Sequence, residues 1–356
     1  MQIISSVLLG WYEKNKRNLP WRGEKDAYLV WVSEIMLQQT RVETVIPYYR
    51  AWQKVFPSVY DLANAPEEEV LLLWEGLGYY ARARNMHHAA QALVNEFEGI
   101  FPRSPEALRK LPGVGEYTAN AIASICFQVP VVAMDANVKR VLARLLDLNV
   151  PISSQSAKME IKEFATNLLA DVNAGDFNQA IMDLGSLVCL PLDPKCHACP
   201  LMDYCGAYKQ NTQNQRPAME KKKAIPLYQV VAAAISNESG RYLLAKRPKG
   251  GMLPGLWEFP GGKVEDGEDD HTALQREIRE ELNTTVSVGN LIGSYRHAYT
   301  HFKVAVRAYL CRLSGPMPQP LEAQDLIWVR CDEMAQFAMG KVDRLISRDL
   351  CQNAPE

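Results

Sequence analysis

The 356-residue sequence predicts a multidomain protein, an all-α domain followed by a smaller α+β domain. Apolar residues recur with helical spacing almost throughout residues 1 to 205, as in "EEEVLLLWEGLGYYARARNMHHAAQALVNEF". Beyond residue 226 the spacing changes, and stretches such as "YQVVAAAIS" and "LIWVR" are typical of strands. Between them lies "GAYKQNTQNQRPAMEKKKAIP", residues 206 to 226, whose prolines and lysine triplet indicate an interdomain linker. The predicted domains are therefore 1–205 and 227–356.

Composition is ordinary for a soluble globular protein, with 47% hydrophobic and 22% charged residues. The first apolar run, in "MQIISSVLLGWYEKNKRNLPW", is too short and too interrupted to span a membrane. We therefore expect a cytoplasmic protein without a membrane partner. A formal net charge of −2 disfavours a wholly basic nucleic-acid binder, but it is compatible with a local basic face.

Four of the eight cysteines crowd into a short loop, residues 189 to 205. Cys189, Cys196, Cys199 and Cys205 follow the spacing C-x6-C-x2-C-x5-C. In a reducing compartment such crowding indicates a metal site rather than disulfides. Four thiolates in one loop hold either a [4Fe–4S] cluster or zinc, and the spacing alone does not choose between them.

The stretch "LPGVGEYTANAIASI", residues 111 to 125, is typical of a helix–hairpin–helix turn. Gly113 and Gly115 would let the backbone approach a DNA phosphate closely and direct N–H groups at it. Taken alone, the stretch is equally well explained as a tight structural turn. Further along, Asp135 and Asn137 open the helical stretch "NVKRVLARLLDL", where Asp135 by itself is more simply explained as a helix N-cap.

These three motifs, in this order over residues 1 to 205, resemble the endonuclease III superfamily of DNA glycosylases. The resemblance implies a [4Fe–4S] cluster that acts structurally and in DNA engagement rather than as the reacting centre. Superfamily members that also cut the strand carry a lysine in the hairpin helix, which forms a Schiff base. This sequence has Tyr117 at that position, and a phenol cannot form an imine, so we expect a monofunctional glycosylase.

Three further stretches, "WVSEIMLQQTRVETVIPYY", "GLGYYARARN" and "LPWR", resemble the adenine DNA glycosylase family, also called the MutY family. The resemblance implies that Glu34 protonates N7 of adenine and that Asp135 stabilises the oxocarbenium ion, with support from Tyr117 and Asn137. The chemistry agrees, because burial among apolar neighbours raises the pKa of a glutamate and lets it carry a proton at neutral pH.

Reaching the glycosidic bond requires extrusion of the adenine from the duplex. The resemblance assigns Gln39, Thr40 and Tyr79 as wedge residues and places Arg17 and Arg22 along the adenine pocket. Packing in the core or on the surface is the alternative for all five. Candidates for a basic DNA face, for which a merely solvated charge is an equal alternative, are Arg82, Arg84, Lys139, Arg140 and Arg144.

The C-terminal domain resembles MutT, the Nudix hydrolase that destroys 8-oxo-dGTP. In adenine glycosylases this domain checks that 8-oxoguanine lies opposite the adenine. Tyr299, Thr300 and His301 match the Phe-Ser-His recognition loop of the family, and threonine keeps the hydroxyl. The alternative is an ordinary strand hairpin with a surface histidine.

Most of the hydrolase motif G-x5-E-x7-R-E-x2-E-E is kept, at Gly262, Glu268, Arg276, Glu277, Glu280 and Glu281. Glu277, Glu280 and Glu281 fall on one helix face, a geometry suited to Mg²⁺ that bridges phosphates. The closing glycine is replaced by Asn283, which tolerates a left-handed helix end. Thr284 stands where an apolar residue is expected. An acidic solvated helix is the alternative to a magnesium site.

The leading hypothesis is a monomeric, monofunctional glycosylase that hydrolyses the N-glycosidic bond of adenine opposite 8-oxoguanine or guanine in double-stranded DNA. A second hypothesis is a nucleotide-pool hydrolase tethered to a DNA-binding module, based on the retained carboxylates. A third is a lesion-binding protein without catalysis, which is disfavoured because both glycosylase carboxylates are present.

Overall fold

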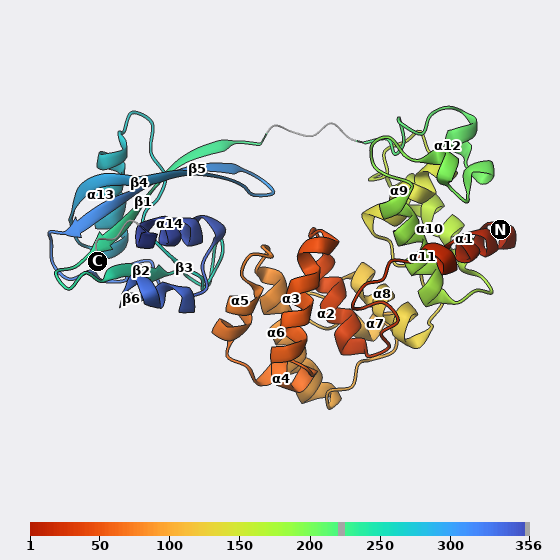
Figure 1. The fold of residues 1–356 in the computed structure, drawn as a ribbon, viewed down its shortest axis with the longest axis horizontal. Coiled ribbons are helices and arrows are strands. Elements are labelled where there is room, and N and C mark those ends of the chain that lie inside the picture. The colour runs from red at the N-terminus through yellow and green to blue at the C-terminus, as the bar shows by residue number, and fades with distance from the viewer. Residues whose placement is uncertain (220–224, 353–356) are drawn as a thin grey trace. The chain divides into compact units, whose positions relative to one another are not determined.

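The computed structural model describes residues 1–219 and 225–352, so positions 220–224 of the predicted linker lie outside the described residues. Contacts between Cα atoms divide the chain into two compact units (Figure 1). The first, here called the helical unit, comprises Met1–Ala65 and Asn85–Lys222. The second, here called the sheet unit, comprises Pro66–Arg84 and Lys223–Glu356. The domain boundaries expected from composition stay a prediction.

The helical unit confirms the predicted all-α class. Its helices are α1 (Gln2–Asn15), α2 (Ala27–Leu37), α3 (Val42–Val55), α4 (Val59–Asn64), most of α6 (Ala81–Phe97), α7 (Pro105–Leu108), α8 (Glu116–Phe127), α9 (Ala136–Leu145), α10 (Gln155–Leu169), α11 (Ala174–Leu187) and α12 (Gly206–Lys209). Two 3-10 turns, η1 (Cys196–Ala198) and η2 (Met202–Tyr204), lie in the cysteine loop.

Polar caps fix where several of these helices begin. The side chain of Asp26 accepts a hydrogen bond from Tyr28 N at the start of α2, and Ser58 and Asp61 form a capping box at α4. Asn173 caps α11 in the same way. Helix α11 contacts α1, α8 and α9, and its apolar residues Phe177 and Ile181 are fully buried in the core. Helices α1, α8 and α9 therefore all pack against α11.

Asn178 of α11 holds the irregular segment between α8 and α9. Its side chain is fully buried, accepts a hydrogen bond from Ala133 N at 2.9 Å and donates to Val131 O at 2.8 Å and Ser124 Oγ at 2.9 Å. Because buried backbone groups must find partners, one side chain satisfies the segment that leads into Asp135.

The beginning of the predicted linker packs on the helical unit. Thr212 donates to Asp147 Oδ1 at 2.5 Å, and Arg216 forms a 2.9 Å ion pair with the same carboxylate. Ile152 N donates to Ala218 O at 3.3 Å. The linker residues 212 to 218 are therefore hydrogen-bonded to the helical unit.

The sheet unit contains a six-stranded sheet of order β3-β2-β1-β5-β4, with β6 paired to β2. The strands are β1 (Leu227–Ser236), β2 (Tyr242–Lys246), β3 (Trp257–Glu258), β4 (Val286–Ala298), β5 (Lys303–Leu313) and β6 (Asp325–Val329). Strands β1 and β5 are parallel, and β4 pairs antiparallel with β5. The mixed sheet with helices confirms the α+β class.

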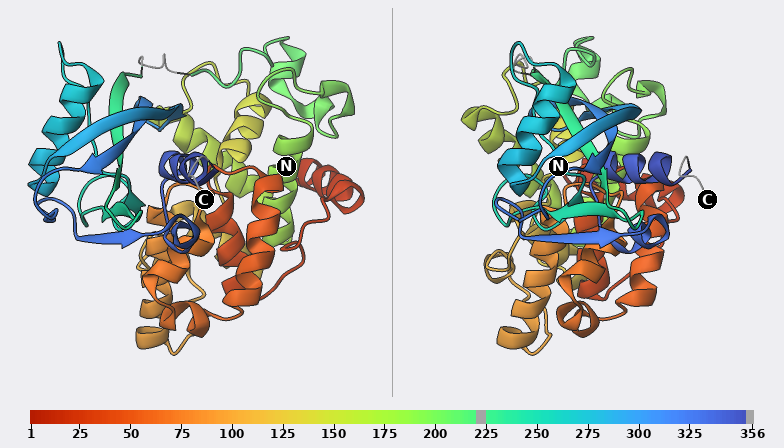
Figure 2. Two further views of the ribbon diagram at one scale, coloured as in Figure 1. Left: turned by 60° about the vertical axis from the view of Figure 1, so that its left-hand side comes forward. Right: turned by 90° about the vertical axis from the view of Figure 1, so that its left-hand side faces the viewer.

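Two helices cover opposite faces of this sheet, as Figures 1 and 2 show. Alternate residues of β1 point to opposite faces. Val231 and Ala233 pack with Ile278 of α13 (Asp270–Leu282), whereas Ala232 packs with Ile346 of α14 (Lys341–Gln352). A 3-10 helix, η3 (Cys331–Gln336), precedes α14.

The sheet unit also contains α5 (Glu67–Trp74) and the segment that follows it. Arg344 of α14 donates to both carboxylate oxygens of Glu75, at 2.5 and 2.8 Å, and Tyr80 donates to Met339 O at 2.8 Å. Lys246 of β2 pairs with Glu68 at 2.8 Å. Segments far apart in sequence thus form one compact body.

No helix among the described residues is long and apolar enough to cross a membrane.

Replacing Asn178 by alanine should destabilise the helical unit. The change leaves Ala133 N and Val131 O buried without a partner, which costs on the order of 2–4 kcal/mol of unfolding free energy. Urea unfolding followed by circular dichroism measures the difference. Thr166→Ala removes a hydroxyl from an exposed position and should change stability by less than about 0.5 kcal/mol. Equal stabilities of the two variants would contradict the role assigned to Asn178.

Candidate active site

Glu34 lies on the buried face of α2, and only 7% of its surface is exposed. Its neighbours Trp31, Ile35 and Met36 are buried apolar residues. The hydroxyl of Tyr117 donates a hydrogen bond to Glu34 Oε2 at 2.5 Å. Burial raises the pKa of Glu34, the hydrogen bond from Tyr117 lowers it, and the charge of Asp135 raises it further. The net direction is upward, as the sequence predicts, so the carboxyl retains its proton more readily than an exposed glutamate.

Tyr117 is positioned by the turn that precedes α8. Gly113 has φ +72°, and a Cβ at this position would come within 2.5 Å of the Asn85 side chain. Gly115 is the N-cap of α8, with extended backbone and open space around it. Two residues later the phenol of Tyr117 points inward. Burial raises the pKa of Tyr117 well above its usual value, so the hydroxyl remains a donor.

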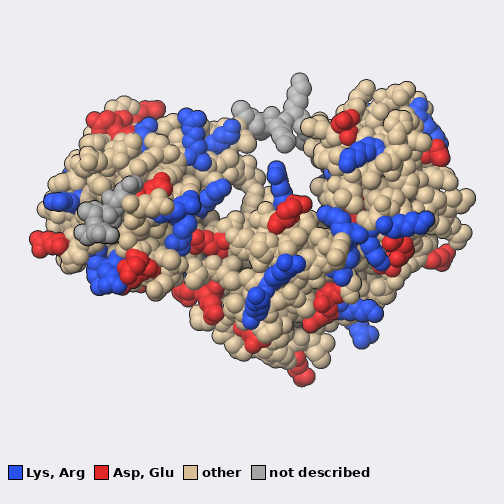
Figure 3. Space-filling view, viewed as in Figure 1, with Lys and Arg blue, Asp and Glu red and all other residues tan. Residues whose placement is uncertain are grey.

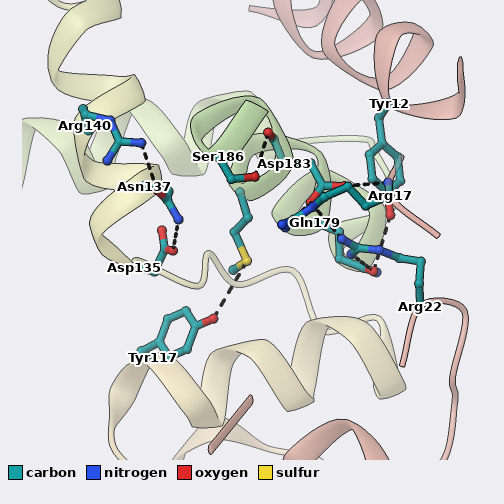
Figure 4. A network of polar contacts seen from close by, with 11 residues as sticks. Tyr12, Arg17, Arg22, Tyr117, Asp135, Asn137, Arg140, Gln179, Asp183 and Ser186 are labelled. Carbon is teal, nitrogen blue, oxygen red and sulfur yellow. Dashed lines mark hydrogen bonds and ion pairs between the residues drawn. The ribbon is translucent and has the colours of Figure 1, made fainter. Parts of the chain in front are cut away.

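Asp135 combines two roles that the sequence leaves as alternatives. It is the N-cap of α9, since Oδ1 accepts a hydrogen bond from Val138 N at 2.6 Å. Its other oxygen accepts from Asn137 Nδ2 at 2.9 Å, and Arg140 donates to Asn137 Oδ1 at 2.8 Å (Figure 4). Burial raises the pKa of Asp135, while the bonds from Val138 and Asn137 lower it. The carboxylate is therefore held in place by its own helix.

Helix α11 packs closely against Asn137. A Cβ on Gly185 would lie 2.7 Å from the Asn137 Cβ. A glycine is therefore needed opposite Asn137, and the "DLGS" stretch of α11 supplies it.

A second polar network lies on α11 beside Tyr117 (Figure 4). Asp183 is fully buried and accepts hydrogen bonds from Arg17 Nη2 at 2.7 Å and Arg22 Nη2 at 2.9 Å. Arg22 also donates to Gln179 Oε1. Met182, on the same helix, has its sulfur 3.8 Å from the Tyr117 hydroxyl. Arg22 is therefore near enough to Glu34 for its charge to lower the pKa of that carboxyl, and Arg17 shares the Asp183 partner of Arg22.

Sequence reasoning missed Gln179 and Asp183. Their signal is a pair of polar residues at i and i+4 within the largely apolar helix "AGDFNQAIMDLGSL". Such a pair on a buried face must find polar partners. Arg17 and Arg22, which the sequence places in the same site, are those partners.

Chemically, this arrangement suits departure of a poor leaving group from a sugar. A carboxyl with a raised pKa can donate a proton, and a second, fixed carboxylate can stabilise the positive charge that develops. The charge of Asp135 raises the pKa of both Glu34 and Tyr117, so the two carboxyls lie near each other.

The predicted wedge residues lie at exposed turns. Gln39 follows α2 directly, is exposed and has φ +56°, and Thr40 is half-buried. Tyr79 belongs to the sheet unit, is 45% exposed and has φ +50°. Left-handed backbone is uncommon for such side chains and marks strained positions that often serve a function.

The predicted basic DNA face is wrong for two of its members. Arg140 and Arg144 are buried, with Arg144 only 2% exposed, so neither can form a surface patch. Arg82 lies over the Trp74 and Tyr79 rings and donates to the carbonyls of residues 77 and 78. On the viewed face of each unit, basic and acidic side chains are both present (Figure 3).

Arg144 instead organises the cysteine loop. Its guanidinium donates to Leu190 O at 2.6 Å and Pro191 O at 3.1 Å, and it lies 3.3 Å from Cys189 Sγ. All four loop cysteines line one small cavity of about 30 Å³. Within 1–219 and 225–352, no group of three or more candidate ligand side chains is arranged as a metal-ion site.

The predicted recognition loop is the hairpin between β4 and β5. Tyr299 N donates to Phe302 O at 2.8 Å, which closes the turn, and Thr300 and His301 are exposed at its tip. Thr300 Oγ1 lies 3.3 Å from the Tyr79 hydroxyl. A predicted wedge residue and a predicted lesion-reading residue are therefore hydrogen-bonded within the sheet unit.

The carboxylate helix α13 has the predicted face, but an arginine occupies it. Arg276 forms ion pairs with Glu268 at 2.8 Å, Glu277 at 3.0 Å and Glu280 at 3.2 Å. Glu281 accepts from Gly261 N at 3.3 Å, and burial raises its pKa to about 7.

The end of α13 explains the two departures from the hydrolase motif. Asn283 adopts the expected left-handed conformation, with φ +49°. Thr284 is buried and donates to Pro316 O at 2.6 Å. Its hydroxyl is therefore satisfied where an apolar side chain was expected.

Two family models match the chain. The HhH-GPD superfamily of base excision DNA repair proteins matches residues 32–168, and the NUDIX domain matches residues 231–348. The adenine DNA glycosylase of Rattus norvegicus is 34% identical over 96% of this chain and 76% of its own length. That of Buchnera aphidicola subsp. Baizongia pistaciae is 35% identical over 85% of this chain and 84% of its own. A thermostable thymine-DNA glycosylase structure is 27% identical with a TM-score of 0.54, covering 58% of this chain and 96% of that one.

The fold, the buried carboxyl pair and these matches define a base-excision DNA glycosylase with an attached Nudix domain. More particularly, the chain belongs to the adenine DNA glycosylase family.

Glu34→Gln should stabilise the protein more at neutral pH than at low pH. Because burial raises the pKa of Glu34 in the folded state, wild-type stability falls as pH rises through that pKa. The variant lacks this titration, and its amide oxygen can still accept from Tyr117. Its advantage in unfolding free energy should therefore grow with pH above 4.5, the ordinary glutamate value, and disappear below it. Denaturant unfolding over a pH series measures the trend, with Glu163→Gln on an exposed part of α10 as control. A difference that shrinks as pH rises would contradict a buried, protonated Glu34.

Proposed function

We propose that this glycosylase is monofunctional and releases adenine paired with 8-oxoguanine or guanine in double-stranded DNA. The observation that carries the proposal is the 2.5 Å hydrogen bond from Tyr117 to Glu34, in the electrostatic range of Asp135. A lysine at residue 117 would suit a lyase, whereas a tyrosine can only orient the carboxyl.

In the proposed mechanism, Glu34 delivers its proton to N7 of the extruded adenine, and the glycosidic bond breaks toward an oxocarbenium ion. Asp135, fixed by Val138 N and Asn137, stabilises that cation. A prearranged carboxylate is effective because it need not reorganise as charge develops. Tyr117 orients Glu34, and Asn137 orients Asp135.

Arg17 and Arg22 would line the adenine pocket. Their shared partner Asp183 holds both guanidiniums, so they present fixed donors to the base rather than free charges. Gln179, bound to Arg22, offers an amide to the same pocket.

Contacts to DNA are assigned to turns rather than to a charged patch. Gly113 and Gly115 would approach a phosphate with backbone N–H groups, and Gln39, Thr40 and Tyr79 would fill the space left by the extruded base. Tyr299, Thr300 and His301 would read 8-oxoguanine. The bond between Tyr79 and Thr300 supports this grouping, because it joins a wedge residue to the reader loop.

We assign Cys189, Cys196, Cys199 and Cys205 as ligands of a [4Fe–4S] cluster. Support comes from the single cavity that all four line and from Arg144, whose guanidinium faces Cys189. Hydrogen bonds to thiolate ligands stabilise their negative charge. When bound, the group would brace the loop that ends the helical domain. Iron analysis of the purified chain tests the assignment, and stoichiometric zinc in its place would contradict it.

Glu277, Glu280 and Glu281 are the residues that would hold Mg²⁺ at the Nudix domain. Arg276, which is itself part of the hydrolase motif, forms ion pairs with Glu277 and Glu280. We place the enzyme in the cytoplasm as a monomer, with the mispaired duplex as its partner.

Single-turnover assays on A:8-oxoguanine and A:G duplexes test the proposed function. Wild type should release adenine from both, and Glu34→Gln should reduce the rate by about 10²- to 10⁴-fold because no proton reaches the leaving group. Glu163→Gln should act like wild type. Borohydride should trap no covalent adduct. An undiminished rate for Glu34→Gln, or a trapped adduct, would rule out this mechanism.

Thr300→Val should weaken the preference for 8-oxoguanine while leaving A:G cleavage nearly unchanged. The variant keeps the shape of threonine and loses only its hydroxyl, which corresponds to about 2- to 10-fold in relative rate. Comparing single-turnover rates on the two mispairs measures the effect. The matched variant Thr285→Val, at an exposed site away from the loop, should keep the wild-type ratio. An equal loss on both mispairs would argue against lesion reading by Thr300.

A further inference from the structure

Two cysteines of the sheet unit lie beside each other, outside the site of base excision. Cys331 is the first residue of η3, and Cys351 lies in the last turn of α14. The Cys351 thiol donates a hydrogen bond to the backbone carbonyl of Cys331 at 3.6 Å and is within hydrogen-bonding reach of the Cys331 thiol. Both residues are only partly buried, so small molecules in solution can reach them.

The other cysteines have different surroundings. Four of them line the cavity of the cysteine loop in the helical unit. Cys126 lies in α8 of the same unit, and Cys311 is buried in the core on the α13 face of the sheet. Cys331 and Cys351, in contrast, pack together against the core on the α14 face. All eight cysteines are described and are free thiols in this structure.

Contacts between η3 and α14 hold the two cysteines in a fixed relation. Arg344 of α14 donates to Met334 O at 2.9 Å and to Phe337 O at 2.6 Å. Ser347, one turn before Cys351, donates to Met334 Sδ at 3.3 Å, and Met334 is only 1% exposed. Because folding brings the two thiols together, a reaction between them is effectively intramolecular and needs no further search.

The reduced pair is stable at neutral pH. Burial, together with the neighbouring Cys331 thiol, raises the pKa of Cys351, so this thiol keeps its proton. A protonated thiol reacts slowly, because the thiolate is the nucleophile in disulfide chemistry. In a reducing compartment, where we place the enzyme, protein disulfides are usually transient and redox-sensing rather than structural.

We propose that Cys331 and Cys351 form a reversible disulfide, with a low-molecular-weight disulfide as the oxidant. The thiolate of one cysteine attacks the small disulfide, whose S–S bond breaks, and one small thiol leaves. The sulfur of the second cysteine then attacks the mixed disulfide, the protein S–S bond forms, and the second small thiol leaves. In total the two cysteines lose two electrons and two protons, which reduce the small disulfide to two thiols.

The disulfide joins η3 to the last turn of α14 and thereby opposes local opening of this helix. Arg344 of α14 binds Glu75, and Met339 O, just before α14, accepts from the Tyr80 hydroxyl. Oxidation therefore also holds the segment that carries Tyr79, one of the proposed wedge residues, more firmly on the sheet unit.

Peptide mapping of the full chain tests the proposal, because trypsin separates the two cysteines. Cleavage after Arg330, Lys341 and Arg348 gives the peptides 331–341 and 349–356, each of which contains one cysteine. The protein is incubated in buffers with an increasing ratio of oxidised to reduced glutathione, and free thiols are then trapped with N-ethylmaleimide. The disulfide-linked pair of these peptides should increase with the ratio and disappear after treatment with dithiothreitol.

Cysteine variants provide the controls. Cys331→Ser and Cys351→Ser should each abolish the linked peptides and leave a glutathione adduct on the cysteine that remains. Cys126→Ser, in the helical unit, should form the linked peptides to the same extent as wild type. Backbone amide exchange in residues 341–352 should slow by about 10-fold when wild type is oxidised, and it should stay unchanged in Cys331→Ser.

Each of three results would overturn the inference. The first is an absence of linked peptides in the most oxidising buffer while both cysteines carry glutathione, which would show that the two sulfurs do not meet. The second is a link from Cys331 to a cysteine other than Cys351. The third is linked protein whose α14 amides exchange as fast as in the reduced protein, which would leave the disulfide without an effect on the helix.

Discussion

The hydrogen bond between the Tyr117 hydroxyl and the buried Glu34 carboxyl is the interaction on which the rest of the active site depends. Burial raises the pKa of Glu34, and the phenol keeps the carboxyl aimed at one place. A second carboxyl at Asp135 makes the arrangement unfavourable for stability, because two buried acidic groups disfavour each other's ionised forms. The helical unit therefore stabilises both carboxyls with hydrogen-bond donors. Tyr117 donates to Glu34, and Val138 N and Asn137 donate to Asp135.

Those donors are held by the architecture of α8, α9 and α11. Asn178 satisfies the backbone that leads into Asp135, and Gly185 lets α11 approach Asn137. On the same helix Asp183 gathers Arg17 and Arg22. One central helix thus contacts the residues that we propose as proton donor support, cation-stabilising carboxylate and base pocket, which explains why its polar residues are buried among apolar ones. In the sheet unit, Tyr299 belongs both to the hairpin between β4 and β5 and to the wall of a cavity.

Features that depend on neighbouring residues could be predicted from the sequence, whereas contacts between distant segments could not. The helix end at Asn283 and the cap at Asp135 depend on a few neighbouring residues, and their conformations follow from spacing and residue type. The raised pKa of Glu34 was also expected, because its neighbours on α2 are apolar. By contrast, the partners of Gln179 and Asp183 are known only from the structure, because they lie in the segment that precedes α2. Arg140 and Arg144 look like surface charges in sequence, yet the cysteine loop and α11 cover them. The grouping of Pro66–Arg84 with the sheet unit depends on Glu75 and Tyr80 meeting residues more than two hundred positions away, which no local pattern reveals.

The protonation state of Glu34 is the central claim, and infrared difference spectroscopy between wild type and Glu34→Gln measures it most directly. The account predicts a protonated-carboxyl C=O band that persists in wild type at pH values above 4.5, the ordinary glutamate value, is absent from the variant, and is lost when a duplex substrate is processed. A band that disappears near pH 4.5, as for an exposed glutamate, would contradict the account.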